Sequence, residues 1–190
     1  MSAPERLSPF GPGLTPGRDG AAGGTPVILS ERRVDIVQVM GAEAAVAGLA
    51  LPKPGRAEIS SDAMIVWIQP SAWLVIRPRG VEGALAKSLA GAAGTKTAVV
   101  DQSHGRAVLR LSGAHARDVL AKGCRIDLHP RAFSAGSAAT TTIDHITVTI
   151  VQVDATPTYD LVLPANFAEA FLDWLGMSAT EFGYEIRPTA

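Results

Sequence analysis

The sequence predicts an α+β fold: a single domain of two similar modules, each an antiparallel sheet with helices packed on one face. Three observations predict it. Many short segments alternate apolar and polar residues with the period of a half-buried strand. Other segments carry apolar residues at helical spacing. One plan of strand, helix, two strands and helix occurs twice.

Composition sets the class of protein. Of 190 residues, 47% are hydrophobic and 18% charged, which indicates a globular chain with apolar surface for a partner to cover. The net charge of −1 and the lack of a basic block give no support for binding nucleic acid or a membrane surface. One cysteine, no signal-peptide pattern and no apolar run long enough to span a bilayer predict a cytoplasmic protein.

Residues 1–25 are rich in Gly and Pro and lack an apolar period, so we expect a flexible N-terminal arm. An alternative is an extended arm that lies across a partner, with Leu7, Phe10 and Leu14 as its anchors. Residues 26–190 form the single domain, with modules at about 26–95 and 96–190.

In the first module, alternating apolar residues predict strands at 27–31, 34–40, 57–60, 64–69 and 73–78. Helices are expected at 42–49, which is rich in Ala, and at 81–89, where Leu85, Ala86 and Leu89 share one face. The stretch 91–97, GAAGTKT, lies between a helix and a strand, the reverse of a phosphate-binding loop, and is interpreted as a turn.

The second module opens with a stretch, 99–133, whose local structure is well specified. Residues 107–111 alternate as a strand, Ser112 can cap the next helix, and Gly123 would end it in a left-handed conformation. A hairpin at 138–143 and 146–153, turning at Asp144-His145, comes next. A strand at 159–163, a helix at 167–177 capped by Asn166, and a strand at 184–186 complete the module.

The repeat aligns a strand, a glycine and a short Ala-bearing segment in both halves, with Gly41 matching Gly113. A later strand, proline and amphipathic helix match with Pro78 against Pro164. The pattern favours two packed α+β modules.

Candidate catalytic residues are few. Asp101, Ser103 and His104 suggest a hydrolase triad, but on a strand His104 points away from the other two, so we reject nucleophilic catalysis. The four histidines have no metal-ligand spacing. Cys124 follows a predicted helix end, where the dipole disfavours a thiolate, and is interpreted as buried and inert.

The turn at 127–133 has two interpretations. It is either a solvated turn or a partner-docking loop, in which Phe133 is an apolar anchor beside charged residues. The candidate partner-interface residues are Phe10, Arg125, Asp127, His129, Arg131 and Phe133.

The run VDQSHGRAVLRLSGAHARDVLAKGCRIDLHPRAF, at 100–133, closely resembles the gamma subunit of heterotetrameric sarcosine oxidase. The likeness extends by pattern over about 26–186, through YDLVLP and the FAEAFLDWL helix. It implies a fold like that of the folate-binding aminomethyltransferases. It also implies a non-catalytic subunit with no catalytic, cofactor-binding or metal residues of its own.

The resemblance further implies alpha, beta and delta partners in a flavoprotein complex of one-carbon metabolism that oxidatively demethylates sarcosine to glycine. FAD, FMN, NAD, zinc and tetrahydrofolate would lie in the other subunits. The alternatives are the equivalent subunit of an N-methylglutamate dehydrogenase-type complex and a stand-alone folate-dependent one-carbon transfer protein.

Overall fold

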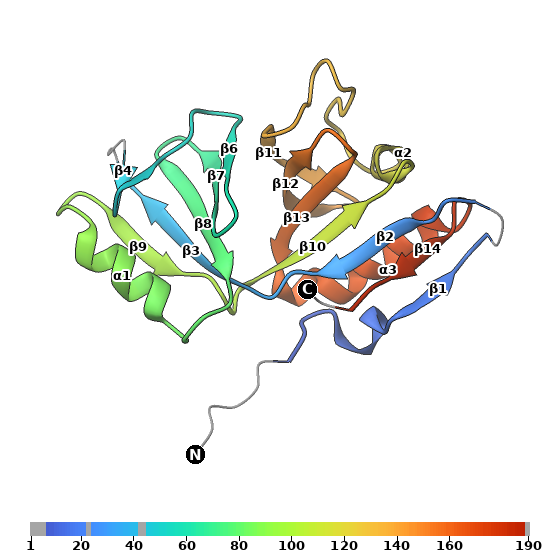
Figure 1. The fold of residues 1–190 in the computed structure, drawn as a ribbon, viewed down its shortest axis with the longest axis horizontal. Helices are drawn as coiled ribbons and strands as arrows, with labels where there is room; N and C mark the ends of the chain where they lie inside the picture. The colour runs from blue at the N-terminus through green and yellow to red at the C-terminus, as the bar shows by residue number, and fades with distance from the viewer. Residues whose placement is uncertain (1–6, 22–23, 42–44, 189–190) are drawn as a thin grey trace.

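The computed structural model describes residues 7–21, 24–41 and 45–188. Two sheets lie side by side, and helices cover their outer faces (Figure 1). The larger sheet has the strand order β1-β14-β2-β10-β13-β12-β11, and the smaller has the order β6-β7-β8-β3-β9. All neighbours pair antiparallel except β14 and β2, which are parallel.

The larger sheet is built mostly from the second half of the chain. In sheet order its strands are β1 (Gly17–Asp19), β14 (Tyr184–Ile186), β2 (Val27–Glu31), β10 (Arg106–Ser112), β13 (Thr158–Pro164), β12 (Ile146–Asp154) and β11 (Ala138–Ile143). Its helical layer consists of η1 (Gly11–Leu14), α2 (Ala116–Ala121), η2 (Ala165–Phe167) and α3 (Ala168–Ala179).

The smaller sheet comes from the first half. Its strands, in sheet order, are β6 (Ala57–Ile59), β7 (Met64–Gln69), β8 (Ala72–Pro78), β3 (Val34–Met40) and β9 (Ala98–Asp101). The helix α1 (Ala84–Ala92) and a small hairpin of β4 (Ala45–Val46) and β5 (Leu49–Ala50) accompany it.

Strand alternation divides the interior into layers. On β10, Leu109 and Leu111 join the core beneath α2 and α3, whereas Val108 faces the smaller sheet. There Val108 packs in a cluster with residues such as Ile36 and Leu74. The larger sheet is therefore covered on both faces, which explains why β13 is buried along nearly its whole length.

The predicted α+β class is confirmed, and so are most strands. Strands 34–40, 64–69 and 184–186 have the bounds that alternation predicts. The predicted hairpin is also present, with Asp144 at φ 43° and His145 at φ 69°. Two successive positive φ values are typical of the two-residue turn whose twist matches that of paired strands.

The predicted helix at 42–49 is wrong. Residues 42–44 lie outside the described residues, and 45–50 form the β4–β5 hairpin, which turns at Ala47 (φ 54°) and Gly48 (φ 75°). Val46 is buried in the core beneath α1. A helix of eight residues has little intrinsic stability, so burial of Val46 and the Gly48 turn decide the conformation.

The predicted caps are also wrong. Ser112 belongs to β10, and neither it nor Asn166 makes a helix-capping side-chain hydrogen bond. Gly123 is not in the left-handed region. A Cβ there would lie 2.5 Å from Cζ2 of Trp174, so Gly123 is required by the close approach of α3.

The predicted module boundary near residue 95 does not coincide with the sheets. β2, from the first half, pairs with β10 and β14 in the larger sheet. β9, from the second half, pairs with β3 in the smaller sheet. The first module therefore gives β2 to the larger sheet and the second gives β9 to the smaller one, and the β2–β3 and β9–β10 links cross between the sheets (Figure 1). Local patterns identify strands but not their distant partners.

The expectation of a flexible arm over 1–25 does not hold for the described residues 7–21. This segment forms η1 and β1, and β1 pairs with β14. Phe10 is fully buried in the core between the larger sheet and its helices, which also contains Phe171 of α3. Burial of one large aromatic side chain and the pairing of β1 offset the ordering entropy of a Gly/Pro-rich segment.

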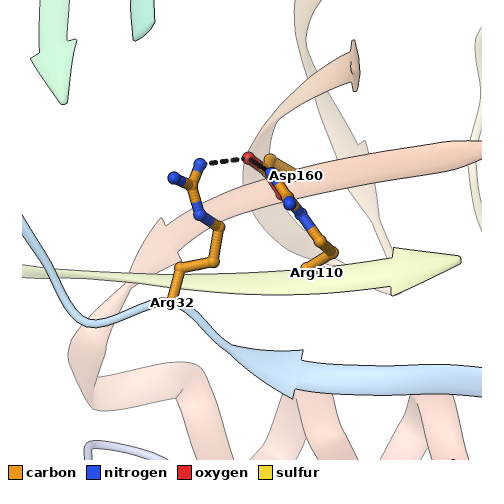
Figure 2. A network of polar contacts seen from close by, with 3 residues as sticks. All are labelled: Arg32, Arg110 and Asp160. Carbon is orange, nitrogen blue, oxygen red and sulfur yellow. Dashed lines mark hydrogen bonds and ion pairs between the residues drawn. The ribbon is translucent and has the colours of Figure 1, made fainter. Parts of the chain in front are cut away.

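A buried carboxylate fixes the β2–β3 link to the larger sheet. Asp160 of β13 is 0% exposed and lies opposite Arg110 of β10. The guanidinium of Arg110 donates from Nε to Oδ1 at 2.7 Å and from Nη2 to Oδ2 at 2.9 Å. Arg32, just after β2, donates from Nη1 to Oδ2 at 2.6 Å (Figure 2). The hydrogen bond with Asp160 raises the pKa of Arg110, although burial opposes that shift.

We predict that Asp160→Asn lowers the free energy of unfolding by about 2–3 kcal/mol, because two guanidinium groups lose their shared counter-ion. Urea unfolding followed by circular dichroism measures this. Glu58→Gln, at an exposed position of β6, also removes one carboxylate charge; it is the control and is expected to change stability by less than about 0.5 kcal/mol. Equal unfolding midpoints for the two variants would show that the Asp160 network is not stabilising.

Candidate functional site

The predicted docking turn is a compact loop after α2, and we call residues 125–133 the docking loop. Its backbone is held by its own side chains. The amide of His129 donates to Oδ1 of Asp127 at 2.8 Å, and the amide of Arg131 donates to Nδ1 of His129 at 3.2 Å. The amides of Ala132 and Phe133 both donate to the carbonyl of His129 at 2.8 Å. These bonds give the loop a defined conformation without a partner.

Two apolar side chains anchor the docking loop from beneath. Leu128 is 4% exposed and Phe133 is 6% exposed, and both belong to the core between the larger sheet and its helices. Arg117 of α2 adds a polar tie, since its Nε donates to the carbonyl of Leu128 at 2.7 Å. The loop is therefore fixed to the core at its middle, through Leu128, and at its C-terminal end, through Phe133.

The interpretation of Phe133 as an exposed apolar anchor is wrong, because its ring fills the chain's own core. The prediction that Phe10 contacts a partner is wrong for the same reason, because its ring is buried in that core too. The other four candidates, Arg125, Asp127, His129 and Arg131, are exposed together on the docking loop. The surface that could meet a partner here is polar and charged.

The Asp101, Ser103 and His104 constellation has a structural role. The Oγ of Ser103 accepts from the amide of Ile36 at 2.9 Å and donates to its carbonyl at 3.3 Å. The amide of Ser103 donates to Oδ1 of Asp101 at 2.9 Å, while His104 contacts Glu82 on the surface, with Nε2 and Oε1 2.9 Å apart. The serine hydroxyl is thus used to join β3 to the segment after β9, and no histidine is positioned to activate it.

Metal ligation finds no support within the part of the chain that the structure describes, where no three His, Cys, Asp or Glu side chains gather into a possible site. In the same part of the chain, none of the helices combines the length and the apolar character needed to cross a bilayer.

Cys124 is half-buried immediately before the docking loop, and its backbone forms an isolated antiparallel β-bridge with that of Ile143. Burial raises the pKa of its thiol, while backbone hydrogen bonds from Ile126 and Arg125 oppose that shift. The interpretation of an inert thiol agrees with this direction, since the thiolate is the reactive form.

Sequence reasoning missed the charged residues between the two sheets. Asp160, Arg110 and Arg32 meet there, and Arg33, Arg79 and Arg106 lie around the same junction. The sequence feature that could have indicated this cluster is a charged residue within an otherwise apolar strand, as at Arg110 in β10 and Asp160 in β13. A charge facing a second sheet needs a counter-ion, but a charge facing water gives the same pattern.

We predict that Phe133→Ala lowers the free energy of unfolding by about 3–5 kcal/mol, because it removes an aromatic ring from a packed core. Arg131→Ala, two residues away and exposed, is expected to stay within about 0.5 kcal/mol of the parent chain. Thermal and urea unfolding of both variants measure the difference. Similar stabilities would contradict the placement of the Phe133 ring.

We also predict that Cys124 reacts with iodoacetamide at pH 8 more slowly than a free thiol such as N-acetylcysteine. The raised pKa leaves less thiolate at that pH, and half-burial limits access. Mass spectrometry over time gives the rate, and unfolding in guanidinium should increase it. Equal rates for the folded and unfolded chain would contradict the prediction.

Comparison with known proteins places the chain in a family. Residues 34–181 match the family described as "Sarcosine oxidase, gamma subunit family". A sarcosine oxidase subunit gamma from Corynebacterium sp. (strain P-1) is 41% identical over 123 residues, which cover 64% of this chain and 59% of that protein. The subunit from an Arthrobacter species is 40% identical over 62% of this chain and 57% of its own length. The matched regions thus span less than two thirds of these two relatives.

Solved structures give the same fold. A chain of the heterotetrameric sarcosine oxidase from Corynebacterium sp. U-96, in complex with pyrrole 2-carboxylate, superposes with a TM-score of 0.77 and 28% identity. That match covers 86% of this chain and 88% of the other. Aminomethyltransferase T of the glycine cleavage system from Bartonella henselae shares the fold at a TM-score of 0.66 and 17% identity, over 87% of this chain and 48% of that one. The resemblance carried by residues 100–133 is therefore confirmed, and the chain belongs to the sarcosine oxidase gamma subunit family.

Proposed function

We propose that this chain is the gamma subunit of a heterotetrameric sarcosine oxidase-type complex, in which it binds and stabilises the other subunits and does not itself carry out catalysis. The observation that carries the proposal is the match, along 86% of this chain, to a chain of a solved heterotetrameric sarcosine oxidase. Family membership over residues 34–181 supports it independently of that structure.

The complex would oxidatively demethylate sarcosine to glycine, with FAD, FMN, NAD, zinc and tetrahydrofolate held by the other subunits. The chemistry of this chain's described residues supports that division of roles. Ser103 is engaged with the backbone of Ile36, burial raises the pKa of Cys124, and Asp160 is paired with two arginines. None of these groups is positioned as a nucleophile or a general base. The single cysteine favours a cytoplasmic complex.

The docking loop is the surface that we assign to a partner subunit. It presents Arg125, Asp127, His129 and Arg131 on a backbone already fixed by hydrogen bonds and by two buried apolar anchors. A preformed loop loses little conformational entropy when it binds, and arginine is enriched among residues that dominate interfaces. This makes the loop suited to a polar, specific contact.

Co-expression with the alpha, beta and delta subunits tests the assembly role. With a tag on this chain, we expect all four subunits to co-elute in one flavin-containing peak. Elution of this chain alone would refute the proposal. Calorimetric titration of the isolated chain with tetrahydrofolate should show no binding, whereas binding would favour the stand-alone one-carbon transfer protein.

We predict that the double variant Arg125→Ala/Arg131→Ala weakens assembly by at least about tenfold in dissociation constant, with the folding of the chain unchanged. Both side chains are exposed, so their loss should remove partner contacts without opening the core. Analytical ultracentrifugation of the reconstituted complex measures the change. Lys87→Ala, on the exposed face of α1, is the control. Equal assembly of the double variant and the control would exclude the docking loop as an interface.

A further inference from the structure

An open groove of about 440 Å³ lies between α3 and β14, near the β1 edge of the larger sheet (Figure 1). We call it the α3 groove, and its lining residues are Leu172, Asp173, Gly176, Met177, Tyr184 and Ile186. The four residues from α3 lie on successive turns, so they form one strip of the helix surface. The volume is within the range of pockets that bind a ligand.

Two glycines keep the α3 groove open. A Cβ on Gly176 would lie 3.3 Å from the hydroxyl oxygen of Tyr184, so no larger residue fits there without a shift. Gly17 of β1 pairs with Ile186, and paired residues project to the same face, so Gly17 brings no side chain over Ile186. The groove therefore belongs to the fold and does not depend on a movable side chain.

The floor of the groove is apolar and its rim is exposed. Leu172 and Ile186 belong to the core and form the floor. Met177 is 71% exposed at the rim, although it is a large apolar side chain. Methionine adapts its shape to an irregular partner surface and is common at binding surfaces. The apolar part of the groove is thus suited to an aliphatic or aromatic side chain.

Two carboxylates of the groove face lack a counter-ion. Asp19 of β1 pairs with Tyr184 and so projects to the same face, and Asp173 lines the groove. Burial raises the pKa of Tyr184, and the negative charges of Asp19 and Asp173 raise it further, which places both carboxylates near one hydroxyl. Within the described part of the chain, neither carboxylate makes an ion pair or a hydrogen bond.

The chain's neighbouring cations are used elsewhere. Arg18 alternates to the other face of β1, opposite Glu185, and Glu185 also pairs with Arg187. Lys122 reaches the end of α3 from α2, where it pairs with Glu181. The last turn of α3 contains no basic residue, and the negative end of its dipole adds to the attraction for a cation.

An apolar floor beside unpaired carboxylates complements a side chain that has an aliphatic stem and a positive end, as lysine and arginine do. We propose that the α3 groove is a second docking site, which binds a segment of a partner subunit that carries a lysine or arginine next to an apolar residue. The cation pairs with Asp19 and Asp173, its stem covers the floor, and the apolar neighbour packs against Met177. This rests on the proposed function, because the segment belongs to another subunit of the complex.

The first test is photo-cross-linking in the assembled four-subunit complex, with Met177 replaced by p-benzoylphenylalanine. We expect a cross-link to another subunit, which mass spectrometry should map to a segment that contains a lysine or arginine. The same replacement at Val81, an exposed apolar residue before α1, is the control and should not label that segment. No cross-link from position 177, a cross-link to a second copy of this chain, or a labelled segment without a basic residue would overturn the proposal.

The second test measures assembly by analytical ultracentrifugation at increasing salt. At about 0.05 M salt, Asp19→Asn/Asp173→Asn should weaken assembly by at least about tenfold, and its salt dependence should be shallower than that of the parent chain. Both carboxylates are exposed, so circular dichroism should show an unchanged fold. Glu58→Gln/Asp62→Asn removes the same charge from the smaller sheet and should stay within about twofold of the parent.

The two proposals fail differently in this test. If the parent chain assembles and the Asp19/Asp173 variant assembles equally well, the α3 groove is refuted as a docking site and the subunit role stays intact. Equal losses in the two double variants refute the groove as well, because the effect is then one of total charge. If the parent chain itself does not assemble, the subunit role is refuted, and the partner proposed for the groove with it.

Discussion

The structure depends on how it accommodates one fully buried carboxylate. A charge without water is costly unless hydrogen bonds and opposite charges compensate it. Asp160 obtains three charge-assisted hydrogen bonds from Arg110 and Arg32. Arg110 lies on the neighbouring strand, whereas Arg32 lies on the link that leaves the larger sheet for the smaller one. Satisfying Asp160 therefore fixes the path of the link, and with it the relative positions of the two sheets and of Arg33.

The sequence predicted those features that depend on neighbouring residues. Strands such as 34–40 and 64–69 alternate clearly because one face is buried and the other is less so, and the Asp144-His145 turn follows from the paired strands around it. Features decided by distant residues were missed. Asp160 is 128 positions from Arg32 and 50 from Arg110, and nothing local to any of them indicates the other two.

The two phenylalanines show the same limit within the candidate site. Phe10 lies in a Gly/Pro-rich segment and Phe133 in a charged turn, where an aromatic residue is equally suited to a partner or to the chain's own core. Both rings enter one core, which also includes Leu128 and Phe171. The charged candidates on the docking loop were easier to place, because a charged side chain stays in water unless a buried counter-ion compensates it, and Arg125 and Arg131 are exposed. Resemblance of residues 100–133 identified the family where individual residues could not.

The place of β14 in the larger sheet also restricts the order of folding. β14 consists of residues 184–186, yet it lies between β1 and β2, which come from residues 17–31. Until residue 186 has left the ribosome, β2 has an unpaired edge on that side, and β1 has no strand to pair with among the described residues. Contacts so distant in sequence form late because loop closure must come first. The sheet is therefore completed only once residues 184–186 have been synthesised, and the unpaired edge of β2 is open to other strands until then.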